Sequence, residues 1–222
     1  MTDPLQGGLP EGPALARRGL LGPTLRRDLA DLNSQYLELA LVPGADGDPR
    51  FDWSDSVRAC LAGVDAATLG RLAAAPFALF ELVATVARRP VPSARVEDAR
   101  PSVVSAAWQA SCYSFAYQAV FLAQRLVDVD PLACRVTLGL SDELATCLGE
   151  CRLPQLAELA GNPWTIRPRW RRHARFWDML VGAARRGTPS ALQWAHCVGL
   201  CLIDASDGVA AAAAQSRRRA RR

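Results

Sequence analysis

The amino-acid sequence predicts an all-α protein. Apolar residues recur at helical spacing, as in the series Leu25, Leu29, Leu32, Tyr36 and Leu39. Capping residues and prolines lie at the ends of these periodic segments. No segment alternates apolar and polar residues as a half-buried strand would. With 222 residues, of which 50% are hydrophobic and 22% charged, the chain can bury a core and is too apolar to be disordered.

The first part of the chain is expected to hold an arm and an N-terminal helical unit. Residues 1–22 are rich in glycine and proline without periodicity, which is typical of a flexible arm. A helix begins after Thr24 and ends at the sequence PGADGDP, 43–49. Ser54 and Asp65 cap two shorter helices, and Pro76 permits a further helix over 77–88. A charged stretch with three prolines, 88–101, is the best linker, so the N-terminal unit covers 23–90.

The second unit, 91–205, begins with a long helix over about 102–127. Residues 101–124 carry no charge and are long enough to span a bilayer, but serine and glutamine interrupt them, and a helix buried in a core shows the same pattern. Shorter helices follow. Those that begin at Pro131, Pro154 and Trp170 end at Gly139, Gly161 and Gly187, and Ser141 caps another between the first two. The final helix begins at Thr188–Pro189 and reaches about 204, before an arginine-rich tail, 206–222.

The composition argues against an enzyme. All 26 basic residues are arginine, so the chain lacks the lysine of Schiff-base chemistry and of P-loop phosphate binding. Only two histidines occur, and no nucleophile–base pair is visible, so we assign no catalytic residue and no cofactor. The N-terminus does not resemble a signal peptide. An odd number of cysteines, seven, within apolar helical patterns is typical of reduced thiols, and we expect a cytoplasmic protein.

Two cysteine pairs, Cys147/Cys151 and Cys197/Cys201, have the spacing of one helical turn. Placed on facing helices, they could form a tetrahedral zinc site. Their spacing is not that of a zinc knuckle, and small buried thiols are the favoured interpretation, so we assign no metal site.

Basic charge is concentrated in two segments, 167–175 and 217–222, which hold five arginines each. The rest of the chain contains 16 arginines and 22 acidic residues. Such a distribution suits an anionic partner, with nucleic acid favoured over a membrane surface; the alternative is that several arginines pair with the acidic remainder of the chain. The residues expected to contact DNA are Arg167, Arg169, Arg171, Arg172 and Arg175, with Arg217, Arg218 and Arg219 of the tail. Because the first group opens a helix pair, we expect backbone contacts rather than base readout.

An internal repeat relates the two units. At an offset of 87 residues, 57–77 aligns with 144–164, so that Cys60 matches Cys147 and Leu72 matches Leu159. Upstream, the helix containing YLELA, 36–40, corresponds to the one containing VFLAQ, 120–124. We interpret the pattern as a duplicated three-helix unit; chance similarity between Leu/Ala-rich helices is the alternative.

The second copy resembles a known family. LAQRL at 122–126, LGLSDELATCLG at 138–149, LPQLAELA at 153–160 and ALQWAH at 191–196 are similar, in order and spacing, to segments of FlhD, the small helical subunit of the FlhD–FlhC flagellar master transcription regulator. The resemblance covers about 115–205. It implies an intertwined helical dimer that assembles with FlhC, where FlhC supplies the zinc and most of the sequence reading, and a helix-turn-helix-like C-terminal part, here 170–204.

This chain departs from that family in length. FlhD-like proteins have one copy, whereas residues 31–90 here look like a degenerate second copy without the ALQWAH helix. We therefore expect a helical bundle of FlhD-like type, a fused pseudo-dimer of two three-helix units with one helix-turn-helix-like arm. The expected function is an FlhD-like transcriptional regulator or co-regulator; the alternative is an adaptor that does not bind DNA. A partner interface, with an FlhC-like subunit or a second copy, is expected at Asp130, Trp194 and His196.

Overall fold

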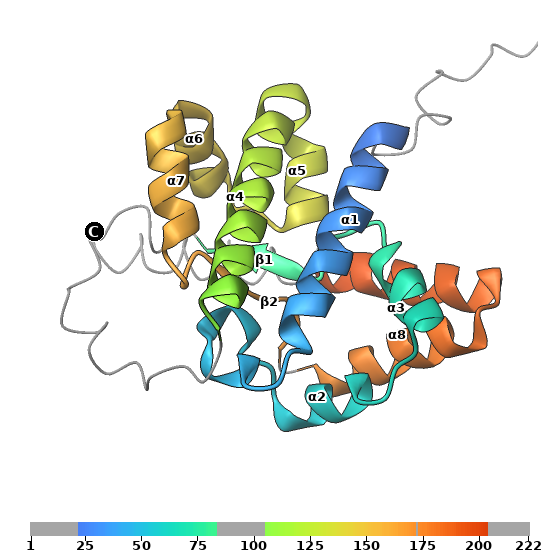
Figure 1. Ribbon diagram of the computed structural model, residues 1–222. Helices are drawn as coiled ribbons and strands as arrows, with labels where there is room; N and C mark the ends of the chain where they lie inside the picture. The colour runs from blue at the N-terminus through green and yellow to red at the C-terminus, as the bar shows by residue number, and fades with distance from the viewer. Residues whose placement is uncertain (1–21, 84–104, 172, 204–222) are drawn as a thin grey trace, which may run out of the picture.

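The computed structural model describes residues 22–83, 105–171 and 173–203. Helices hold most of these residues, and the strands among them form one two-stranded sheet (Figure 1). The mostly helical fold class is therefore confirmed. The expected arm up to residue 21, the linker at 88–101 and the tail at 206–222 lie outside the described residues, as does the boundary between the two units at 90/91.

The described elements follow one another in two similar series. The first series comprises α1 (Pro23–Ala40), the 3₁₀ turns η2 (Ala45–Gly47) and η3 (Pro49–Phe51), α2 (Asp55–Leu61), α3 (Ala66–Ala73) and β1 (Phe80–Leu82). The second comprises α4 (Ala106–Val129), α5 (Pro131–Leu138), α6 (Asp142–Glu150), α7 (Leu153–Gly161), β2 (Ile166–Pro168) and α8 (Ala174–Arg186). A final helix, 189–203, follows α8.

Most helix boundaries lie where capping chemistry predicts them. The side chains of Asp65, Asp130 and Ser141 accept hydrogen bonds from backbone N–H groups three residues on, at 2.7, 2.9 and 3.3 Å. Gly139 and Gly187 end α5 and α8 with positive φ angles of 68° and 66°. The first helix differs slightly, because it begins at Pro23.

Two predictions about secondary structure are wrong. The helix expected over 77–88 is absent from its described part: residues 77–83 are non-helical and contain β1. The run Phe77, Ala78, Leu79 and Phe80 is fully buried, and a continuous apolar run of this length is as typical of a buried strand as of a helix. The helix expected from Trp170 begins only at Ala174, because Trp170 turns the chain with a φ of 52°.

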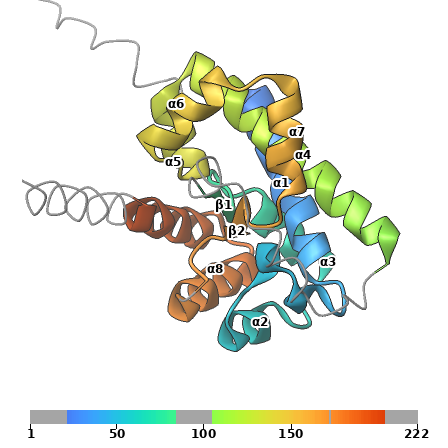
Figure 2. The ribbon, with the colours of Figure 1, turned by 90° about the vertical axis from the view of Figure 1, so that its left-hand side faces the viewer.

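The two strands pair antiparallel across the two series. Glu81 lies opposite Arg167, at nearly the offset that relates the repeated segments. The contacts around the sheet are reciprocal: η3 of the first series contacts β2, and α5 of the second contacts β1. Helices α1 and α4 pack against each other, and α8 packs on α2 and α3 of the first series. The halves are therefore interleaved rather than side by side (Figures 1 and 2).

An aromatic cluster fills the junction between the halves. The Tyr36 ring on α1 lies 5.4–5.6 Å, centroid to centroid, from the rings of Phe51, Trp53, Phe80 and Phe115. Its hydroxyl donates to the carbonyl oxygen of Arg50 at 3.0 Å, and burial raises the Tyr36 pKa well above its usual value. This cluster joins α1, η3, β1 and α4 into one core.

The long uncharged helix of the second half, α4, belongs to this core. It buries the side that carries Phe115 and packs against α1, α5, α6 and α7. Within the described ranges, none of the helices combines the length and hydropathy needed to cross a bilayer. Helix α4 is therefore a helix of the protein core, with one side buried against its neighbours.

The segment between α3 and β1 is held by one buried amide. The Asn33 Nδ2 group donates to the carbonyl oxygens of Ala73 and Phe77 at 3.1 and 2.9 Å, and its Oδ1 accepts from the Leu79 N–H at 2.9 Å. Asn33 has no exposed surface, so these bonds are shielded from water. A single side chain on α1 thus fixes the path of the chain into the sheet.

Candidate functional site

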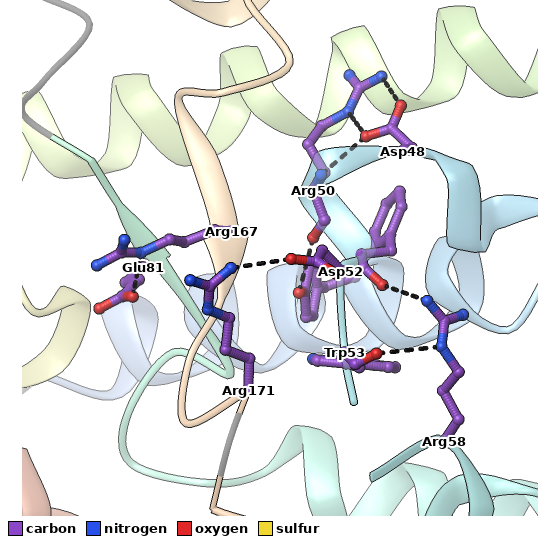
Figure 3. A network of polar contacts seen from close by, with 10 residues as sticks. Asp48, Arg50, Asp52, Trp53, Arg58, Glu81, Arg167 and Arg171 are labelled. Atoms are coloured by element: carbon purple, nitrogen blue, oxygen red, sulfur yellow. Dashed lines mark hydrogen bonds and ion pairs between the residues drawn. The ribbon is translucent and has the colours of Figure 1, made fainter. Parts of the chain in front are cut away.

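The arginines expected to contact DNA do not form one surface. Arg167, on β2, donates through Nε to Glu81, and Arg171 Nη1 lies 2.9 Å from Asp52 Oδ2 (Figure 3). Both acidic partners belong to the first series of elements. Arg175 is exposed in the first turn of α8, and the side chain of Arg172 and residues 217–219 lie outside the described residues. Arg167 and Arg171 therefore pair with acidic residues of the chain itself, which is the alternative to DNA contact given for these arginines above.

Arg169 is in the core, with 3% of its surface exposed. Its Nη1 donates to the carbonyl oxygens of Ala78 and Thr137 at 3.2 and 3.0 Å, and its Cζ lies 5.2 Å from the Trp170 ring centroid. The DNA contact predicted for Arg169 does not fit this position, because a phosphate cannot reach a buried guanidinium. Its burial could not be predicted from the sequence, because its hydrogen-bond partners are backbone carbonyls and every residue type has one.

Gly139 makes room for this guanidinium. Its φ of +68° favours glycine, and a Cβ built on it would lie 2.0 Å from Arg169 Nη2. The glycine that ends α5 therefore also allows the arginine to approach the Thr137 carbonyl of α5.

Trp170 starts the C-terminal helix pair. Its ring packs on Phe77 and Phe176, with centroids 5.0 and 4.5 Å away, while its backbone adopts the left-handed conformation. A non-glycine residue in this region is uncommon and is held by its surroundings. Here the two aromatic contacts anchor the turn that directs the chain from β2 into α8.

The C-terminal helix pair consists of α8 and the final helix, 189–203, and its exposed basic residues lie on α8. Arg175, Arg185 and Arg186 are exposed, and the last two belong to the final turn of the helix. The second helix, 189–203, contains no Arg, Lys, Asp or Glu. Arg and Lys are the usual phosphate-binding residues, so the groups of this pair suited to phosphate contact lie on α8.

One face of the final helix packs closely against the Phe77 ring, and the opposite face is exposed and uncharged. A Cβ at Gly199 would lie 2.5 Å from the Phe77 ring, so only glycine permits this approach. The outer face carries Trp194, with 67% of its surface exposed. The other exposed side chains of the helix are Pro189, Ser190, Gln193, Cys197 and Cys201. Exposed tryptophan without nearby charge on its helix is typical of a protein interface.

His196 lies on the inner flank of the same helix, not beside Trp194. Its ring meets Phe77 edge-on at 5.9 Å, and its buried Nε2 has no hydrogen-bond partner among the described residues. Burial lowers the His196 pKa. The residue lines a pocket of about 640 Å³ between α1, the loop after α3 and the final helix, together with Arg26, Leu29 and Leu200.

The third residue expected at the partner interface, Asp130, is elsewhere. It is exposed at the junction of α4 and α5, where its carboxylate caps α5, on a different part of the fold from the final helix (Figure 1). The structure therefore does not bring Asp130, Trp194 and His196 together.

The thiols form no site among the described residues. The pairs Cys147/Cys151 and Cys197/Cys201 lie on different helices, and no group of three or more His, Cys, Asp or Glu in the described ranges is arranged to hold a metal ion. Burial raises the pKa of Cys112 and of Cys134 to about 12. Cys60 donates to Asp178 at 2.7 Å, and its pKa is raised to about 11, chiefly by desolvation. These three thiols are protonated at neutral pH and are weak nucleophiles.

No protein-family model matches this sequence, and no curated protein or solved structure shows significant similarity to it.

The placement of Arg169 predicts an unequal effect of two glycine substitutions. Gly63→Ala introduces a side chain at a φ of +68° with no atom within 4 Å, so it should cost about 1 kcal/mol of folding free energy. Gly139→Ala combines the same φ with the Arg169 contact, and it should cost about 2–4 kcal/mol more because the guanidinium must leave its carbonyls. Urea denaturation of both variants measures the difference; equal losses would contradict the buried position of Arg169.

Proposed function

We propose that this protein is an FlhD-like regulatory subunit that acts in the cytoplasm by binding another protein through its final helix. The observation that carries the proposal is the outer face of that helix, where Trp194 is 67% exposed and no charged residue occurs between 189 and 203. A buried aromatic anchor surrounded by uncharged side chains is the usual composition of an interface centre. The partner we propose is an FlhC-like subunit.

The arrangement of the two series supports the FlhD-like part of the proposal. In an FlhD-like pseudo-dimer, equivalent elements of two copies meet at a two-fold axis. Packing of α1 on α4, pairing of β1 with β2, and the reciprocal contacts of η3 and α5 with the strands are the contacts such an axis would produce. We therefore propose that 23–83 and 106–168 are two copies of one unit fused in a single chain.

DNA contact is the second part of the proposal. We assign it to Arg175, Arg185 and Arg186 on α8, with Arg172, Arg217, Arg218 and Arg219 as further candidates outside the described side chains. Arg167 and Arg171 have acidic partners, and Arg169 is buried, so none of these three is retained. A few arginines on one helix would bind the phosphate backbone and position an assembly, while the partner reads the sequence.

An adaptor without DNA binding is the second candidate. It is favoured by the internal use of arginines: Arg50, Arg58 and Arg71, like Arg167, Arg169 and Arg171, bond to carboxylates or carbonyls of the chain itself. Such a protein would bind or sequester a regulator subunit with the same final helix.

Partner binding should depend on Trp194. We expect Trp194→Ala to weaken binding to the FlhC-like protein of the same genome by at least about tenfold, because truncation of a central aromatic hot spot costs about 2 kcal/mol or more and about 1.4 kcal/mol is tenfold. Trp164→Ala is the matched control, since Trp164 is 55% exposed but lies between α7 and β2. Calorimetric titration measures both. A wild-type chain that does not bind, or equal effects of the two variants, would contradict the assignment.

DNA binding should depend on α8. The triple variant Arg175→Ala, Arg185→Ala, Arg186→Ala should bind duplex DNA more weakly and reduce the slope of log affinity against log salt by up to about 3, since each lost phosphate contact reduces it by about 0.9. Replacing Arg26, Arg125 and Arg152 by alanine removes the same charge from other exposed positions and should have less effect. Fluorescence anisotropy at several salt concentrations measures the slope. If the wild type binds no DNA while partner binding persists, the adaptor is the correct function.

A further inference from the structure

Helix α4 has an outward face that carries no charge over most of its length. From Ala106 to Gln124 the helix contains no Asp, Glu, Arg, Lys or His, although 22% of the whole chain is charged. The exposed residues of this stretch are Ala106, Ala107, Gln109, Ala110, Ser111, Tyr113, Ser114, Gln118 and Phe121. The solvent face of a helix in a globular protein normally carries charged side chains. Depletion of charge together with exposed aromatic rings is typical of an interface.

This face is distinct from the side of α4 that packs in the core. The opposite side, with Cys112, Phe115 and Ala119, is buried against neighbouring helices. Figure 2 shows α4 along an edge of the molecule, and Figure 1 shows it on the near side. The outward face is therefore placed where another molecule could reach it.

The exposed residues follow the spacing of a coiled-coil seam. Ala107, Ser114 and Phe121 are seven residues apart, and positions 110/111 and 117/118 lie between them. The rings on this face are ordered: Tyr117 stacks on Phe121 with centroids 6.4 Å apart and planes within 5°, and Tyr113 stacks on Tyr117 at 6.4 Å. A seam of this kind fits a helix as its occupant.

The side chains change in size along the seam. The N-terminal part carries alanine and serine next to Gln109 and the 43% exposed Tyr113, and the C-terminal part carries Tyr117 and Phe121, with Ser114 midway. In an antiparallel pair of α4 helices crossing at Ser114, Phe121 of each copy would face Ala107 of the other, and Tyr117 would face Ser111. Alternating large and small residues is how facing helices interdigitate. Arg125 would fall beyond the overlap, so no charge would be buried.

We propose that two copies of this chain associate through antiparallel packing of their α4 helices, with a two-fold axis at Ser114. This interface is separate from the final helix, so it stands or falls independently of the proposed function. The overlap of residues 107–121 spans about 21 Å at 1.5 Å per residue. One helix pair of this length buries less than the roughly 1,200–2,000 Å² of a standard stable complex, so we expect a weak dimer whose population depends on concentration.

Sedimentation velocity of the full chain from about 1 to 200 μM tests the proposal. The mass should rise from the 23.9 kDa of the monomer towards twice that value. Ser114→Arg places two like charges at the axis and should weaken association at least about tenfold. Ala59→Arg, which adds the same charge to an exposed alanine of α2, should dimerise like the wild type. Thermal unfolding checks that both variants remain folded.

Mixing complementary charges tests the axis itself. Ser114→Arg and Ser114→Glu should each associate at least about tenfold more weakly than the wild type, and their equimolar mixture should recover the dimer, because position 114 of one copy lies opposite position 114 of the other. A wild type that stays monomeric at 200 μM, as it would if this face binds only a different protein, overturns the proposal. So does a Ser114→Arg variant that dimerises normally. Loss of the dimer in both variants without recovery in the mixture overturns the axis at Ser114.

Discussion

An extended stretch of backbone runs through the middle of a helical molecule, and its polar groups need partners there. Buried N–H and C=O groups are almost always hydrogen bonded, because leaving one unpaired costs about 1–3 kcal/mol. For residues 77–83 these partners come from distant parts of the chain. Asn33 binds Phe77 and Leu79, Thr137 O accepts from Ala78 N–H at 2.8 Å, and Arg169 binds Ala78 O. Helices α1 and α5 and strand β2 are thereby fixed around one segment.

The need of buried carbonyl oxygens for hydrogen-bond donors also explains the positions of several arginines. The chain has no lysine, and planar guanidinium groups can reach several carbonyls at once. Arg58 donates to the carbonyl oxygens of Phe51 and Trp53 (Figure 3). Arg169 likewise donates to those of Ala78 and Thr137. Such arginines stabilise irregular segments between helices and are not available to a ligand. Two exposed helix faces carry no charge, residues 106–124 of α4 and the final helix, and exposed basic residues lie beside the latter on α8.

Features set by local chemistry could be predicted from the sequence. Helices α5, α6 and α7 and the C-terminal end of α8 follow caps, prolines and glycines that act within a few residues. Strands β1 and β2 could not, because each has three residues and exists only through the other, 86 positions away at Glu81 and Arg167. The position of Arg169 depends on carbonyls 91 and 32 positions away. The arginine cluster therefore looked continuous in the sequence and is divided in the structure.

Native-state hydrogen exchange at three amides tests most directly whether the buried segment organises the fold. The N–H groups of Ala78, Leu79 and Val83 bond to Thr137 O, Asn33 Oδ1 and Thr165 O, each from a distant part of the chain. If the segment is the common support of both halves, these amides exchange only when the whole molecule unfolds, with the free energy that denaturation gives for global unfolding. Exchange at the rate of the exposed turn at Gly63 would contradict the account, because β1 would then open while the helices around it stayed folded.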